Sequence, residues 1–205
     1  MYILVQNSFS SNIKPVELEK VQFLYLGNDV KIWPHAKLIN TENISIGHRT
    51  IIDDFTLIIA MGEPIKIGNF VHISSFCSIT GKGGFEMEDL AGLAAGVRIS
   101  TSDEDYAGGT CLTNPTIFPE FRRTFDKKVI IKKHAIIGTN SVILPGVTIG
   151  EGCAVGANSL ITKDLEPWSV YIGIPAKKVK ERPREIIQKL EIEMFKKYPE
   201  NFARE

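Results

Sequence analysis

An aliphatic or small apolar residue returns at every sixth position along much of this chain. An amphipathic helix would repeat its apolar residues every three or four positions, and a half-buried strand would alternate over a short run. A period of six fits neither pattern. It indicates short strands joined by turns at fixed intervals, which is typical of a repeat architecture. The clearest run is Ile137, Ile143, Ile149, Val155 and Ile161.

Three strands of six residues would close one triangular coil of 18 residues, and successive coils would pair in parallel about 4.8 Å apart. Apolar residues 18 positions apart would then stack in a core that no single coil could bury alone. This predicts Ile67 under Phe85 and Ile73 under Ala91. Compact residues at the fourth position after each aliphatic residue would fill the corners, Cys77 and Cys153 among them. The earlier positions in this register are Leu26, Ile32, Leu38, Ile46, Ile52, Ile58, Ile67, Ile73, Ile79, Phe85, Ala91, Val97 and Ile131.

The period is interrupted once and ends before the last residues. Val97 and Ile131 are 34 positions apart, 28 more than one repeat, so residues 100–128 are expected to leave the coils as a loop at one corner. Loops of this length in compact domains are usually functional. After Pro183, apolar residues at helical spacing predict an amphipathic helix. The predicted parts are an N-terminal extension (1–25), a repeat domain (26–182) and a C-terminal helix (183–205). The helix would place on one face Ile186, Ile187, Leu190, Met194 and Phe195.

Composition and charge exclude several classes of function. The 24 basic and 24 acidic side chains leave no net charge, so neither nucleic acid nor a membrane surface is an expected partner. No apolar run approaches the roughly 20 residues of a membrane span, and the first residues lack the features of a signal peptide. Three cysteines without metal-ligand spacing indicate free thiols in a reducing cytoplasm and no metal site.

The repeat, its interruption and the ending "GIPAKKVK" together resemble the hexapeptide-repeat acyltransferases. The stretches "AGLAAGVRISTSDEDY", "LTNPTIFPEF" and "IIKKHAIIGTNSVILPG" are most similar to the acetyltransferases of nucleotide-linked amino sugars, the viosamine N-acetyltransferase type. The resemblance implies an all-β fold, a left-handed parallel β-helix with an extruded loop and a short C-terminal α-helix. It also implies transfer of acetyl from acetyl-coenzyme A to the amine of a dTDP-linked amino-deoxysugar for surface polysaccharide. Family members work as homotrimers with active sites at subunit boundaries.

The resemblance assigns a set of positions to coenzyme A, which runs along the last coils in family members. Small residues there would let the pantetheine arm lie against the backbone, and lysines would meet the phosphates in charge-assisted contacts. The alternative is that the lysines form only a solvated basic face. The matching positions are Thr139, Ala157, Thr162, Lys163, Lys177 and Lys180.

The loop and one early corner are expected to bind the nucleotide-linked sugar. Polar side chains crowd the loop, and two adjacent arginines could meet a diphosphate bidentately. The residues assigned to this substrate are Ser75, Asp105, Tyr106, Asn114, Arg122 and Arg123.

The catalytic base is where the sequence departs from related enzymes. Many sugar and antibiotic acetyltransferases of this fold carry a histidine just after the repeat breaks, and Asp103 stands in its place here. His134 is the first candidate for the group nearest the reacting amine, ahead of His72 and Asp103. It is expected near the root of the loop, with Glu88 one coil away to orient its imidazole. An amine that arrives neutral needs no strong base, because the leaving thiolate can take its proton.

Three other functions are alternatives for a repeat of this kind. O-acetylation of a sugar hydroxyl is the main one, although a hydroxyl needs a positioned base. A zinc carbonic anhydrase would need three histidines around the metal, whereas the two nearest in sequence, His35 and His48, are 13 positions apart. A non-catalytic binding module would need neither the loop nor the lysine-rich end.

Overall fold

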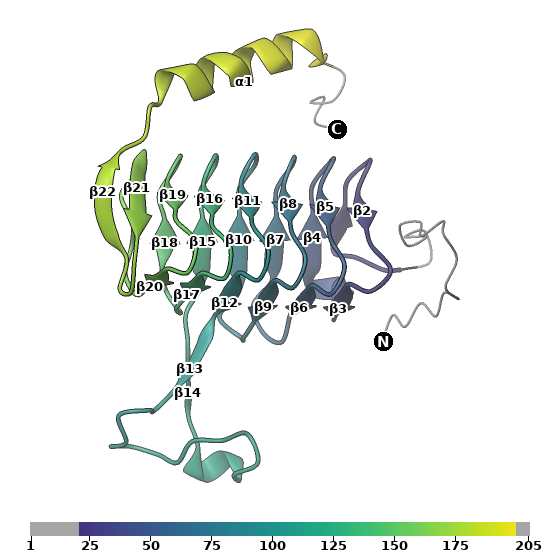
Figure 1. The fold of residues 1–205 in the computed structure, drawn as a ribbon. Helices are drawn as coiled ribbons and strands as arrows, with labels where there is room; N and C mark the ends of the chain where they lie inside the picture. The colour runs from purple at the N-terminus through teal and green to yellow at the C-terminus, as the bar shows by residue number, and fades with distance from the viewer. Residues whose placement is uncertain (1–20, 200–205) are drawn as a thin grey trace.

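Three parallel sheets form the walls of a solenoid in the computed structural model, which describes residues 21–199 (Figure 1). The chain passes through sheets A, B and C in turn, so each coil has an A–B, a B–C and a C–A corner. Sheet A contains β1 (Tyr25–Leu26), β4 (Ile44–Ile46), β7 (Ile65–Ile67), β10 (Phe85–Met87), β15 (Val129–Ile131) and β18 (Thr148–Ile149). Sheet B contains β2 (Lys31–Ile32), β5 (Ile51–Ile52), β8 (His72–Ile73), β11 (Gly92–Leu93), β16 (Ile136–Ile137), β19 (Ala154–Val155), β21 (Ser169–Ile172) and β22 (Lys177–Glu181). Sheet C contains β3 (Lys37–Ile39), β6 (Leu57–Ile59), β9 (Ser78–Thr80), β12 (Arg98–Ser100), β17 (Val142–Ile143) and β20 (Leu160–Ile161).

The core is a column of aliphatic side chains inside the coils, as the period of six predicts. Most of them are completely buried, including Ile73, Ile137 and Ile143. Many corners need a left-handed backbone, which most side chains resist. Asn140 and Asn158 supply it with φ of 59° and 55°, a conformation that asparagine adopts readily. The chain can therefore turn at each corner without interrupting the parallel ladders.

The spacing between stacked residues differs from the prediction in the first half of the molecule. In the last coils the 18-residue spacing is confirmed, because Ile131 pairs with Ile149 and Ile137 with Val155. The predicted stacking of Ile67 under Phe85 and Ile73 under Ala91 is wrong. Ile67 pairs with Met87 and Ile73 with Leu93, 20 positions away.

The longer early coils result from longer C–A corners. Residues 60–64 and 81–84 make wider turns there, and Gly81 and Gly84 have φ of 119° and 81°. Phe85 and Met87 both point inward, each 1% exposed. Strand alternation lets either residue satisfy the apolar pattern, so the sequence pattern alone does not show the two residues added at 81–84.

The extruded loop leaves from the C–A corner after β12 and returns to β15. Two antiparallel strands form its stem, β13 (Ser102–Glu104) and β14 (Thr124–Asp126). Beyond the stem the loop includes a 3-10 turn (Pro119–Phe121) and projects away from the solenoid (Figure 1). The coils on either side pair directly, β10 with β15 and β12 with β17, so the loop does not interrupt the ladders.

The chain ends in α1 (Glu185–Lys197), which runs beside the solenoid on the side away from the loop (Figure 1). Its contact face differs from the predicted one. Ile187, Met194 and Phe195 are half-buried, but Ile186 and Leu190 are 64% and 58% exposed. Within residues 21–199 no helix has both the length and the apolar character that a membrane crossing requires.

Candidate functional site

Small residues occupy one position of the B–C corner in successive coils. Gly96 donates its N–H to the Ser75 carbonyl, Asn140 donates to Ala95, and Asn158 donates to Thr139, so these coils are in direct register. We call the resulting line of residues the corner column. It consists of Ser75, Ala95, Thr139 and Ala157, and the pairing of Val155 with Tyr171 adds Gly173 in the last coil. Three of the predicted positions, Ser75, Thr139 and Ala157, therefore lie on one line parallel to the solenoid axis.

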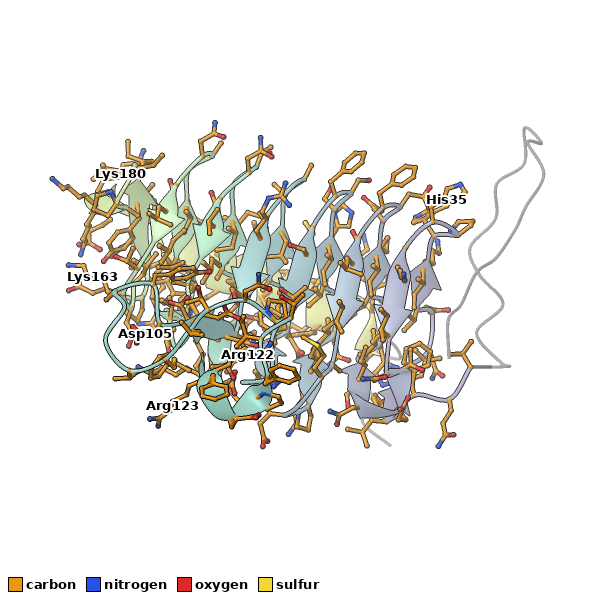
Figure 2. All side chains as sticks on the ribbon, turned by 90° about the horizontal axis from the view of Figure 1, so that it is seen from below. His35, Asp105, Arg122, Arg123, Lys163 and Lys180 are labelled. Carbon is orange, nitrogen blue, oxygen red and sulfur yellow. The ribbon has the colours of Figure 1, made fainter. Side chains whose placement is uncertain are left out.

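The predicted coenzyme lysines lie at the C-terminal end of the solenoid. Lys177 and Lys180 belong to β22, the last strand of sheet B, and pair with Ile172 and Val170. Thr162 and Lys163 follow β20 and lie toward the C–A corner, and Figure 2 shows Lys163 and Lys180 at the same end, opposite His35. Within residues 21–199, no hydrogen bond or ion pair holds the side chain of Lys163, Lys177 or Lys180.

The neighbouring Lys178 differs from those three lysines. Its Nζ lies 2.8 Å from Glu166 Oε2 and 2.7 Å from Glu181 Oε1. Hydrogen bonds from these two carboxylates raise the pKa of Lys178 above its usual value. The basic ending therefore contains one lysine that two carboxylates already hold, and two, Lys177 and Lys180, that remain free to bind an anion.

His72 extends from sheet B one coil before Gly92, close to the corner column. Its Nε2 lies 2.9 Å from Asp53 Oδ2, and the Ser74 hydroxyl donates to the same oxygen at 3.4 Å. The His72 side chain is 56% exposed, so it can reach a bound molecule. A carboxylate on one ring nitrogen fixes the imidazole and leaves the other nitrogen available to accept a proton.

His134 does not have the surroundings expected from the sequence. Its turn is at the A–B corner, whereas the loop leaves from the C–A corner, so the expected position at the root of the loop is wrong. Glu88 is also not its partner, because that carboxylate accepts from Lys132 Nζ and from the Lys133 N–H. His134 Nε2 instead lies 2.8 Å from Glu191 Oε2 of α1.

The histidine is thereby enclosed under the C-terminal helix. Its side chain is 9% exposed, and the Trp168 ring lies 6.0 Å from its ring. Lys133 Nζ forms an ion pair with the same Glu191. Burial raises the pKa of Glu191, but the hydrogen bonds from Lys133 and His134 outweigh it and leave the pKa below its usual value. This arrangement is suited to attaching α1 and does not expose His134 to a substrate.

Asp103 and Asp105 accept hydrogen bonds from other residues of the loop. Asp105 accepts hydrogen bonds from the N–H groups of Gly108, Gly109 and Thr110 and from the Thr110 hydroxyl. The bonds from Thr110 are the main reason that the pKa of Asp105 is lowered. Asp103 lies on the stem strand β13 and accepts from the N–H of Glu104. Within its own chain Asp103 is at a different corner from His72, so the structure does not bring these two candidates together.

The loop arginines are better placed to contact a ligand than the acidic residues of the loop. Arg122 and Arg123 line a cavity of about 460 Å³ inside the loop together with Thr110, Cys111, Leu112, Glu120 and Phe121. Asn114 accepts from the N–H and hydroxyl of Thr116, and Tyr106 is 81% exposed. Figure 2 places Asp105, Arg122 and Arg123 together in the loop. Two further cavities, of about 380 and 520 Å³, lie over sheet A and contain charged pairs such as Lys132–Glu88, away from the corner column.

The predicted corner-filling role of two cysteines is confirmed. Cys77 and Cys153 are 1% and 0% exposed, and burial raises their pKa values to about 11 and about 12. Both thiols are therefore protonated and unreactive at neutral pH. Among residues 21–199 no three His, Cys, Asp or Glu side chains are arranged to hold a metal ion.

Sequence reasoning missed two partners of the candidate histidines, Asp53 and Glu191. His72 pairs with Ile51, 21 positions earlier, and Asp53 lies two residues beyond Ile51 on the same face of the strand, so the true register was needed to see the contact. Glu191 is 57 positions from His134, and no local pattern connects them.

Comparison with known proteins identifies relatives that match most of the chain. Residues 128–163 match the family described as bacterial transferase hexapeptide (six repeats). The chain is 37% identical over 173 residues to a dTDP-4-amino-4,6-dideoxy-D-glucose acyltransferase of Escherichia coli, covering 84% of this chain and 90% of that one. It is also 29% identical over 141 residues to a putative lipopolysaccharide biosynthesis O-acetyl transferase, WbbJ, of Escherichia coli K12, covering 68% and 69% of the two chains.

A solved structure is similar over nearly its full length. It is a variant of AntD, an N-acyltransferase from Bacillus cereus, in complex with dTDP-4-amino-4,6-dideoxyglucose and coenzyme A. The two chains are 38% identical and superpose with a TM-score of 0.83, covering 88% of this chain and 95% of AntD.

Proposed function

Because the chain belongs to the hexapeptide-repeat acyltransferases, we propose that it moves acetyl from acetyl-coenzyme A to the amine of a dTDP-linked amino-deoxysugar. The relatives named for this sugar nucleotide support the substrate class. The observation in this chain that carries the proposal is the corner column, which leads from the free lysines at the C-terminal end to His72 and Ser75.

The side chains along this path fit coenzyme A. Ala95, Thr139 and Ala157 leave backbone accessible along the corner, so a thin pantetheine arm can lie against it. Lys177 and Lys180, with Lys163 nearby, provide unpaired ammonium groups for the phosphates. The thioester would then lie near Ala95, within reach of the face that carries His72.

His72 is the residue that we assign to the reacting amine, in place of His134. In the reaction the amine nitrogen bonds to the thioester carbonyl carbon, the carbon–sulfur bond breaks, and the amine loses one proton. His72, held by Asp53, accepts that proton and passes it to the leaving thiolate or to water. The Ser75 hydroxyl lies on the same corner and orients the sugar.

We propose further that the enzyme is a homotrimer and that a neighbouring copy completes each site. The loop leaves from the C–A corner, not the B–C corner, and projects away from the solenoid (Figure 1). A loop that covers the corner column must therefore come from another copy. Arg122 and Arg123 of that loop would meet the diphosphate, and Tyr106, Asn114 and Asp103 would line the sugar. The ordered turn that Asp105 holds would support them.

The cellular role follows from the same chemistry. Acetyl-coenzyme A and sugar nucleotides are cytoplasmic metabolites, and Cys77 and Cys153 are unpaired thiols of the kind found in a reducing compartment. We therefore place the enzyme in the cytoplasm, where it modifies a sugar nucleotide for surface polysaccharide such as lipopolysaccharide.

Thiol release from acetyl-coenzyme A tests the function against a panel of dTDP-linked and UDP-linked sugars with and without an amine. The proposal expects turnover with an amino sugar and a product that no longer reacts with an amine reagent. O-acetylation is the second candidate, because the His72–Asp53 pair supplies the base that a hydroxyl needs. A product that keeps its free amine would favour it and refute N-acetylation.

A further inference from the structure

The N-terminal half of the B–C corner carries exposed aromatic rings where the later coils carry asparagines. Phe55 and Phe76 occupy the position that Asn140 and Asn158 hold in later coils, and His35 lies one coil before Phe55. His35 stacks on Phe55 with ring centroids 5.3 Å apart, and Phe55 stacks on Phe76 at 5.2 Å. The ring planes are within 12° and 9° of parallel. We call His35, Phe55 and Phe76 the aromatic ladder.

The ladder is not part of the core. Phe55 and Phe76 are 56% and 60% exposed, and contiguous exposed apolar surface of this kind marks a binding site more often than it serves stability. Both phenylalanines also lie in the left-handed backbone conformation, with φ of 61° and 63°. This conformation is unfavourable for a bulky side chain such as phenylalanine. In the later coils the same backbone position carries asparagine, which adopts this conformation more readily.

The ladder continues the corner column toward the N-terminus. From the coil of Ala95 to the coil of His35 there are three steps, or about 14 Å at ~4.8 Å each. Coenzyme A approaches the reacting amine from the C-terminal direction in the proposed function. The remainder of the second substrate therefore has the N-terminal half of this corner open to it, and that remainder is a diphosphate and a nucleoside.

A free cation lies beside the C-terminal end of the ladder. Arg98 belongs to β12 and pairs with Ser78, two residues beyond Phe76. Its side chain is exposed, and within residues 21–199 it has no hydrogen-bond or ion-pair partner. A guanidinium at this point can meet a diphosphate that connects a sugar near Ser75 to a nucleoside further along the corner.

We propose that the aromatic ladder binds the nucleoside of the nucleotide-linked sugar. The base stacks against its rings, and Arg98 contacts the diphosphate together with the loop arginines of the neighbouring copy. The free face of His35, which has no ring contact within the described residues, receives the base. Deoxyribose packs on the exposed edges of Phe55 and Phe76. This inference rests on the proposed function, because it names the subsite for one part of that substrate.

The test replaces Phe55 and Phe76 together by asparagine, the residue that the later coils carry at the same backbone conformation. Phe70→Asn is the matched control, because Phe70 lies in the same coil as Phe76, has φ of 55°, and is at the A–B corner instead. The probe is dTDP itself, with binding measured by calorimetry. Loss of base stacking is expected to weaken dTDP about ten-fold or more, with the KM for acetyl-coenzyme A and the assembly mass unchanged.

Three further measurements distinguish base stacking on the ladder from contacts with the sugar and the diphosphate. An amino sugar 1-phosphate, which has no nucleoside, should show the same KM with the wild type and the double variant. His35→Phe should keep dTDP affinity, and His35→Asn should lower it. Arg98→Ala should weaken dTDP and leave thymidine binding unchanged.

Unchanged dTDP affinity in the double variant would overturn the proposal. A fall in assembly mass would also overturn it, because the ladder would then be a contact between copies of the chain. If wild-type protein neither binds dTDP nor acetylates any nucleotide-linked sugar, the proposed function has failed first. If the wild type binds dTDP and acetylates a nucleotide-linked sugar, and the double variant binds dTDP equally well, only the ladder proposal has failed.

Discussion

Alanine at Lys177 or Lys180 should weaken coenzyme A, whereas alanine at Lys178 should not. Lys177 and Lys180 have no carboxylate partner in the described chain, so their ammonium groups are available to phosphate. Lys178 is already held by Glu166 and Glu181 at 2.8 and 2.7 Å. One charge-assisted phosphate contact contributes about 1.5 kcal/mol, which corresponds to roughly ten-fold in affinity. The double variant should therefore lose about a hundred-fold if the two contacts are independent.

The assay measures the dissociation constant of coenzyme A and the KM of acetyl-coenzyme A at low and at moderate salt. Salt screens exposed charges, so the difference between the wild type and the variants should shrink as salt rises. Dephospho-coenzyme A shows which lysine contacts the 3′-phosphate. Replacing that lysine should leave the affinity for this analogue unchanged, because the analogue lacks the 3′-phosphate. The reasoning is refuted if Lys178→Ala costs as much as Lys177→Ala, or if the double variant binds coenzyme A unchanged.

Three other predictions follow from the titratable groups. His72→Asn should lower turnover by roughly 10²–10⁴-fold and remove the acidic limb of the pH–rate profile, whereas His134→Asn should lower the melting temperature and keep that limb; the opposite result would return the catalytic role to His134. The lowered pKa of Glu191 stabilises the fold above the usual carboxyl pKa of 4.5, and this contribution is lost as pH falls through the lowered value. The melting-temperature advantage of the wild type over Glu191→Gln should therefore be full at pH 7 and vanish in strong acid, and a difference that stays constant with pH would contradict this. Cys77 and Cys153 should resist a thiol reagent at pH 8 in the folded protein, since burial raises their pKa values to about 11 and about 12; rapid labelling of either would show that the coils open.

Much of the fold could be predicted from the sequence because its repeating unit is local. Each six-residue stretch carries its own inward aliphatic residue and its own turn residue, as Ile137 and Asn140 do. The same local pattern indicates the extruded loop and the C-terminal helix. The family resemblance singles out Thr139 and Ala157, and the structure places them on one line. Lys177 and Lys180 could also be identified in the sequence, although whether a lysine is paired cannot be inferred from its neighbours in the chain.

Only the tertiary structure decided which residues face one another. A coil of 20 residues in place of 18 moves Ile67 from Phe85 to Met87, because strand alternation buries both residues and the pattern does not distinguish them. In the coil before, Ile51 pairs with His72, 21 positions away, and this register sets Asp53 beside His72. The enclosure of His134 depends on Glu191, which arrives from a helix 57 positions later. Local pattern therefore determined the elements, and contacts between distant coils decided which histidine is exposed to a substrate.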